Sequence, residues 1–135
     1  MINNFKWSDF CLLADSLIDN NDEAKQRTSI SRYYYGCFCP SRDFIFEKML
    51  FLNNDNERKM KSKKGIIHNE TRKVFERHPY FKNCKKGKII SKNLEKLRKN
   101  RNQADYDIEI KFLNKKLIDS KTRSKTILKL LDEFN

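Results

Sequence analysis

The sequence LRKNRNQADYD occupies residues 97–107, and the prediction of the fold starts from it. Apolar residues recur through and before this stretch at steps of three and four, as on one face of an α-helix: Ile90, Leu94, Leu97, Ala104 and Ile108. The position that this face skips holds Arg101. A guanidinium in line with a packing face is costly unless it is paired or faces a wet cleft. The stretch therefore predicts a packed helix with a polar interruption.

Three polar residues accompany Arg101 in this stretch: Asn102, Asp105 and Tyr106. Asn102 and Tyr106 are four residues apart, which places them on one flank of the predicted helix. The cluster can be a functional site. Alternatively, Arg101 and Asp105, which are also four apart, form an ordinary helix ion pair. The spacing alone leaves both interpretations open.

The composition favours a bundle of helices. With 135 residues and a mass of 16.3 kDa, the chain is expected to form one domain that buries a real core. Three Gly and two Pro provide little turn chemistry, which favours few long helices over many short strands. The net charge of +12 predicts attraction to polyanions, with RNA or DNA ahead of acidic membranes.

The cysteine and hydropathy patterns argue against several other classes of protein. The four cysteines form no CxxC pair, and neither histidine lies at ligand spacing from them. We therefore expect no zinc site and no other cofactor. The start MINNFKWSDF lacks an apolar signal core, and no run approaches the length of a membrane span. The expectation is a soluble, cytoplasmic protein with reduced cysteines.

The apolar periodicity predicts five helices, at residues 5–19, 22–52, 65–77, 88–105 and 111–134. The second contains Pro40, which lacks an N–H and is expected to kink it. Residues 53–64 show many charges and no apolar pattern, so they are predicted to be an exposed loop. The basic end of this loop, with Lys61, Lys63 and Lys64, is a candidate RNA contact. The predicted fold is an all-α antiparallel bundle of four long helices plus a shorter helix.

Two segments resemble motifs of the HEPN domain family: SRYYYGCF at residues 31–38 and LRKNRNQADYD at residues 97–107. Their order and separation in a helical chain of this length also fit that family, and the resemblance covers essentially the whole chain. It implies a helical bundle that commonly forms a homodimer. Many HEPN proteins are metal-independent endoribonucleases of toxin–antitoxin, antiviral defence or CRISPR systems. The resemblance thus implies RNA as a ligand, and a nucleotidyltransferase antitoxin or a CRISPR or defence complex as a protein partner.

The catalytic signature of that family is an arginine, usually followed by a polar residue, and a histidine four to six residues beyond the arginine. Arg101 matches the arginine and Asn102 the polar residue, but Tyr106 occupies the histidine position. RNA cleavage through the 2′-hydroxyl needs a base, an acid and positive charge on the phosphorane. A phenol is a poor base at neutral pH, because its ordinary pKa is about 10. His68 lies on another predicted helix, and nothing in the sequence places it near Arg101.

The expected function follows from the presence of Tyr106 at the position of the family histidine. We expect a HEPN-like module that binds RNA or a partner protein through Arg101, with Arg98 as a further RNA contact, and that lacks full catalytic competence. The alternative is an active metal-independent endoribonuclease that uses Arg101, Asn102 and Tyr106. A third interpretation is a helical scaffold whose basic charge serves only solubility.

Overall fold

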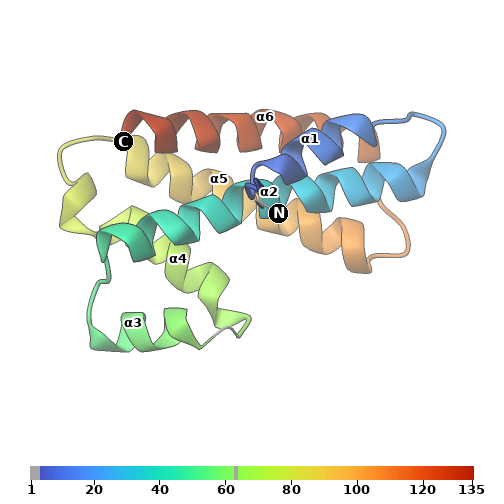
Figure 1. The fold of residues 1–135 in the computed structure, drawn as a ribbon. Helices are drawn as coiled ribbons and strands as arrows, with labels where there is room; N and C mark the ends of the chain where they lie inside the picture. The colour runs from blue at the N-terminus through green and yellow to red at the C-terminus, as the bar shows by residue number, and fades with distance from the viewer. Residues whose placement is uncertain (1–3, 63) are drawn as a thin grey trace.

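Three long helices form the body of the protein (Figure 1): α2 (Glu23–Lys48), α5 (Lys86–Tyr106) and α6 (Leu113–Glu133). The computed structural model describes residues 4–62 and 64–135, and all regular structure within them is helical. The shorter elements are α1 (Asp9–Ser16), α3 (Asn54–Lys61), α4 (Ile66–Arg77) and the 3₁₀ helix η1 (Pro79–Phe81). The all-α class is confirmed. The prediction of four long helices is wrong, because α1 is only eight residues long.

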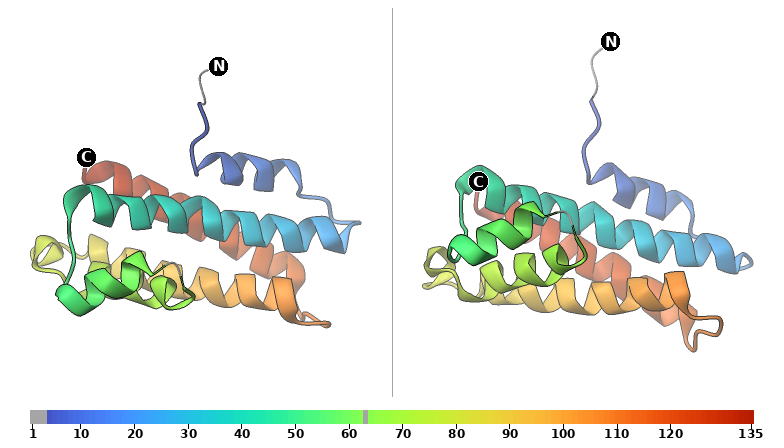
Figure 2. Two further views of the ribbon diagram at one scale, coloured as in Figure 1. Left: turned by 60° about the horizontal axis from the view of Figure 1, so that its bottom comes forward. Right: turned by 90° about the horizontal axis from the view of Figure 1, so that it is seen from below.

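The long helix α2 lies at the centre of the fold and packs against α1, α5 and α6. In both views of Figure 2, α2 and α6 run in one direction and α5 in the opposite one. The ion pair between Lys86 Nζ and Glu133 Oε2, at 2.9 Å, joins the start of α5 to the end of α6, as antiparallel neighbours require. The helix α4 lies against α5, and α3 lies against α4. The stretch at residues 97–107 therefore lies on a helix that contacts α2, α4 and α6.

The packing face of α5 is largely as the periodicity predicts. Ile90, Leu94, Leu97 and Ala104 are buried. The prediction for Ile108 is wrong, since its side chain is 92% exposed. The helix ends at Tyr106, just before it, and the apolar spacing continues past the last helical turn.

A residue of α2 holds this end of α5 in place. The guanidinium of Arg27 donates hydrogen bonds to three backbone carbonyl oxygens, those of Ala104, Asp107 and Ile108. The last carbonyls of a helix have no partner within the helix. A cation at this end also complements the helix dipole. This contact fixes the position of the end of α5 relative to α2.

The helix α2 begins where the sequence predicts. Asp22 caps it, because its side chain accepts a hydrogen bond of 3.0 Å from the Lys25 N–H. The helix continues through Pro40 to Lys48 and ends at Met49, whose φ of 54° lies in the left-handed region. Beyond Pro40, the Ser41 hydroxyl donates to the Cys37 carbonyl oxygen at 2.7 Å. The kink at Pro40 stays a prediction.

The predicted loop at residues 53–64 is wrong, because most of it forms the helix α3. The Asn53 side chain caps this helix by accepting a 2.8 Å hydrogen bond from the Asn56 N–H. An ion pair of 2.7 Å between Lys61 and Glu57 supports its exposed face. Met60 is the one apolar residue of α3, and it is fully buried. A single apolar residue produces no periodicity, so the sequence pattern misses the helix.

The connection between α4 and α5 is short, because α5 begins at Lys86, two residues before its predicted start. The helix α4 ends at Arg77, as the following His78–Pro79 pair predicts, and η1 follows directly. Gly87 lies in the first turn of α5, where a Cβ would lie 2.7 Å from the Phe81 Cβ and closer still to the Phe75 carbonyl oxygen. Glycine is therefore required at this position for α5 to approach α4.

Candidate functional site

Arg101 is paired with a carboxylate on its own helix. Its Nε lies 2.8 Å from Asp105 Oδ2, and the two side chains are 16% and 27% exposed. The contact is close enough for an ion pair but is not aligned for a hydrogen bond at Nε. Nη1 of Arg101 donates a 2.9 Å hydrogen bond to Asn102 Oδ1. The helix ion pair that the spacing allows is therefore present, and it gives the Arg101 guanidinium a counter-charge.

Two tyrosine rings flank the Arg101 guanidinium. Its central carbon lies 5.2 Å from the centroid of the Tyr35 ring on α2 and 5.5 Å from that of the Tyr106 ring. Both distances are within the range of cation–π contacts. The Tyr106 side chain is 72% exposed, and its hydroxyl bonds to none of the described residues. Tyr106 thus contacts Arg101 through its ring. Its contacts with the described residues give its hydroxyl no partner for proton transfer.

A pocket lies beside this cluster, between α2, α4 and α5. Its volume is about 210 Å³. Eight residues line it: Tyr34, His68, Asn69, Arg72, Leu94, Glu95, Arg98 and Asn102. Asn102 belongs to both places, since it lines the pocket and accepts the hydrogen bond from Arg101. The pocket and the Arg101 cluster are therefore adjacent parts of one polar region on α5.

Arg98 is the unpaired cation of this pocket. Its side chain is half-buried, and its Nε is buried without a hydrogen-bond partner. Within residues 4–62 and 64–135 it makes neither an ion pair nor a hydrogen bond. Arg72 differs, because it contacts Glu76 Oε2 and Asn69 Oδ1, each at 2.9 Å. A half-buried guanidinium without a counter-charge is costly, so the pocket favours an anion.

His68 is the titratable group that the structure brings to this pocket. Its ring stacks on Phe38 with a centroid distance of 4.4 Å, and its Nδ1 lies 2.5 Å from the Tyr34 hydroxyl. The pKa of His68 is lowered to about 4, first by burial and then by the charges of Arg98, Arg101 and Arg42. The ring is therefore neutral at neutral pH. The low pKa thus reflects burial first and the positive charge of the surrounding arginines second.

The proposed site residues separate into two groups in the structure. Arg98 and Asn102 line the pocket, and Arg101 and Tyr106 lie next to it. Lys61 lies elsewhere, with its Nζ 2.7 Å from Glu57 Oε2 and 5.7 Å from the centroid of the Phe51 ring. Lys64 does not line the pocket either, and Lys63 lies outside the described residues. His68 and Arg72 were not predicted as site residues, because no spacing within the sequence relates α4 to α5.

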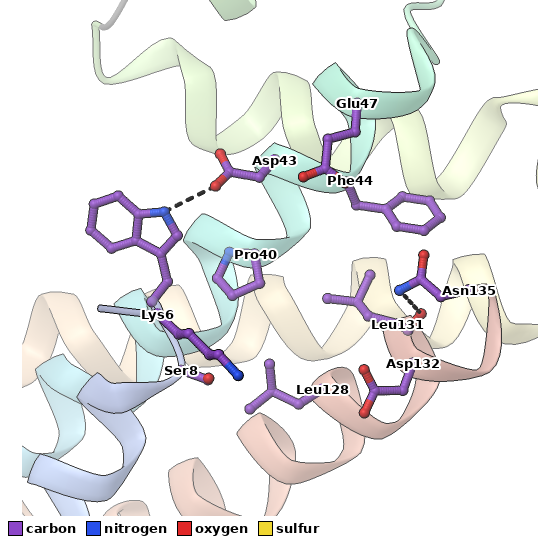
Figure 3. A pocket seen from close by; sticks show the side chains of 11 residues that line it. Lys6, Ser8, Pro40, Asp43, Phe44, Glu47, Leu128, Leu131, Asp132 and Asn135 are labelled. Carbon is purple, nitrogen blue, oxygen red and sulfur yellow. Dashed lines mark hydrogen bonds between the residues drawn. The ribbon is translucent and has the colours of Figure 1, made fainter. Parts of the chain in front are cut away.

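A second hollow, of about 310 Å³, has the opposite electrostatic character (Figure 3). It lies between the segment before α1, the second half of α2 and the end of α6. The side chains of Asp43, Glu47 and Asp132 surround it, and Lys6 is the one basic residue among the described residues that line it. Trp7 closes one side by donating a 2.9 Å hydrogen bond from Nε1 to Asp43 Oδ2. Three carboxylates make this hollow unsuitable for a phosphate group.

Comparison with known proteins found no matching family model, no matching curated protein and no matching solved structure. Among the described residues, no group of three or more His, Cys, Asp or Glu side chains is arranged to hold a metal ion. No helix in the same part of the chain is both long and apolar enough to cross a membrane. The proposals below therefore rest on the residues of the polar region of α5.

Proposed function

We propose that this protein is a HEPN-like module that binds RNA through the polar region of α5 and lacks full catalytic competence. The observation that carries the proposal is the unpaired, half-buried guanidinium of Arg98 in a pocket that holds a second arginine, Arg72. Arginine is suited to phosphate because its planar fork can donate two parallel hydrogen bonds. Arg101 supports the site through Asn102, and its own guanidinium is paired with Asp105.

Further basic residues extend this surface along α4 and α5. A hollow of about 640 Å³ at the connection of these helices is lined by four cations: Arg77, Lys82, Lys85 and Lys88. None of the four makes an ion pair within residues 4–62 and 64–135. Both hollows are bounded by α4 and α5. The basic residues of the two hollows can therefore contact several phosphates of one RNA strand that follows these helices. Several phosphate contacts require a steep dependence of the binding constant on salt.

The proposed lack of catalysis follows from the proton-transfer groups. The Tyr106 hydroxyl has no hydrogen-bond partner among the described residues. No described side chain is therefore placed to take its proton and activate it as a general base. Arg101, the residue that matches the family arginine, is already paired with Asp105 at 2.8 Å. These residues support phosphate binding better than bond cleavage.

One observation favours an active endoribonuclease as the second candidate. His68 lines the same pocket as Arg98 and is neutral at neutral pH, so it is in the protonation state of a general base. In this alternative, Nδ1 of His68 donates to the Tyr34 hydroxyl oxygen, which leaves Nε2 as the acceptor. Nε2 then takes the proton of the 2′-hydroxyl, and Arg98 stabilises the charge of the phosphorane. A base with a pKa of about 4 is weak, which is why binding without cleavage is the preferred proposal.

We also propose a homodimer formed at the end of α5. Three large apolar side chains are exposed at this end: Tyr106 by 72%, Ile108 by 92% and Phe112 by 69%. Association through them places the Arg101 clusters of two subunits near each other. Light scattering of the wild type and of Ile108→Glu tests this contact. A monomeric wild type at micromolar concentration contradicts it.

The test of RNA binding compares two variants that lose the same charge. Arg98→Gln removes the unpaired guanidinium, whereas Arg58→Gln removes one that is exposed and paired with Asp55 at the surface. Fluorescence anisotropy with single-stranded RNA at several salt concentrations should show weaker binding for Arg98→Gln. The slope of log K against log salt should also fall by about 0.7 to 0.9 for the lost contact. Equal binding by both variants, or no binding by the wild type at low salt, contradicts the proposal.

A cleavage assay in the presence of EDTA distinguishes the two candidate functions. A binding module leaves the RNA intact with the wild type and with every variant. Cleavage that is lost in both His68→Gln and Arg98→Gln supports the nuclease that uses this pocket. Cleavage that is lost in Arg101→Ala and Tyr106→Phe, and retained or raised in Tyr106→His, supports the arrangement of the family signature instead.

A further inference from the structure

We infer that the pocket between α2, α4 and α5 binds one phosphate group, with Arg98 and Arg72 as its charged ligands and His68 as an uncharged hydrogen-bond donor. The inference rests on the proposed RNA binding and assigns a specific subsite to it. The pocket volume of about 210 Å³ is below the roughly 300–1,000 Å³ of typical small-molecule sites. It suits a phosphate group with the adjoining part of a ribose better than a whole nucleotide.

The hydrogen bond between Tyr34 and His68 determines the role of the imidazole. Burial raises the pKa of the Tyr34 hydroxyl, which therefore keeps its proton. This hydroxyl has no acceptor among the described residues other than His68 Nδ1. Its proton is therefore donated to Nδ1, and the neutral ring carries its own proton on Nε2. His68 thus offers a donor to an anion without adding a charge to a pocket that already holds two arginines.

The remaining polar groups of the pocket are consistent with a single bound anion. The buried Nε of Arg98 has an unused donor, which is the kind of group that a phosphate oxygen would satisfy. The Asn102 side chain is held by Arg101 through its Oδ1, so its amide nitrogen remains free to donate. Glu95 also lines the pocket, but it is exposed and makes no ion pair within the described residues.

A bound phosphate should be detectable through His68. The charged and titratable groups around this ring come from three helices: Tyr34, Tyr35 and Arg42 on α2, Arg72 on α4, and Glu95, Arg98 and Arg101 on α5. A phosphate dianion cancels part of the positive potential that lowers the pKa of His68. The pKa of His68 should therefore rise when the pocket is occupied, and protons should be taken up on binding below neutral pH.

The first experiment uses inorganic phosphate as the probe. The Cε1–H resonance of His68 in the full chain is followed by NMR during a phosphate titration at constant ionic strength. A saturable shift is expected in the wild type and in Arg58→Gln, and no saturable shift in Arg98→Gln. A circular-dichroism melt checks that Arg98→Gln is folded, and Asn102→Ala, with a weaker saturable shift, provides a second variant. A wild-type resonance that does not respond overturns the inference.

The second experiment distinguishes the source of the phosphate and separates this inference from the proposed function. Short RNAs of one sequence are compared with and without a 5′-phosphate. Tighter binding of the phosphorylated RNA, lost in Arg98→Gln, identifies a terminal phosphate; equal binding that weakens equally in Arg98→Gln identifies an internal one. If both RNAs bind and neither weakens in Arg98→Gln, the subsite is refuted while RNA binding stands. If phosphate shifts His68 but no RNA binds, the subsite stands and the proposed function fails.

Discussion

The depressed pKa of His68 makes the stability of the protein depend on pH in a predictable direction. The unfolded chain protonates this histidine near pH 6.5, whereas the folded protein protonates it near pH 4. Below pH 6.5 the unfolded state therefore binds a proton that the folded state excludes. The contribution of His68 to folding is complete above pH 6.5 and is lost progressively as the pH falls toward 4. At 1.36 kcal/mol per pKa unit the full shift corresponds to about 3 kcal/mol. Solvent screening of the half-buried ring reduces this to about 1 to 2 kcal/mol.

The measurement is a comparison of the wild type with His68→Gln by urea unfolding at several pH values between 7.5 and 4.5. All other titrating groups are common to both proteins, so their contributions cancel in the difference. His68→Gln should be the less stable protein at pH 7.5, because it loses the stacking on Phe38 and the hydrogen bond with Tyr34. The difference should then shrink by about 1 to 2 kcal/mol as the pH falls to 4.5. A difference that stays constant or grows with acidity would falsify the assignment of a neutral His68.

Three further substitutions test the packing that positions the site, each by thermal or urea unfolding. Gly87→Ala should destabilise the fold by about 2 kcal/mol or more because a Cβ has no room there, whereas Gly65→Ala meets no atom within 4 Å and should have little effect. Arg27→Ala should cost about 2 to 3 kcal/mol through the loss of three hydrogen bonds to the end of α5, while Arg58→Ala at an exposed pair should cost under about 1 kcal/mol. Met60→Ala should cost about 2 to 4 kcal/mol if α3 is packed as a helix, and a change below about 0.5 kcal/mol would support the exposed loop instead.

The sequence pattern predicts the wrong helix boundaries in two places, for two different physical reasons. The segment before α1 contains Phe5 and Trp7, whose rings pack against each other and against the ring of Phe10 in the first turn of α1. The spacing of these apolar residues predicts a helix that starts at residue 5. The rings of Phe5 and Trp7 pack against aromatic neighbours instead, and this packing does not need a helix at residues 5–8. At α3 the opposite occurs, because Met60 alone anchors a helix that periodicity does not show. Periodicity thus fails where few residues are buried or where aromatic contacts replace helical ones.

The sequence by itself determined the features that depend on neighbours along one helix. The packing face of α5 follows from residues three and four apart. The ion pair between Arg101 and Asp105 is one of the two interpretations that the spacing left open, and the structure shows it. The positive charge follows from composition alone. The tertiary structure decided the surroundings of Arg98. Within residues 4–62 and 64–135 its guanidinium has no partner, and His68 and Arg72 reach the same pocket from another helix. How two helices meet depends on the sum of many side-chain contacts over the whole core, and no spacing within one helix records that sum.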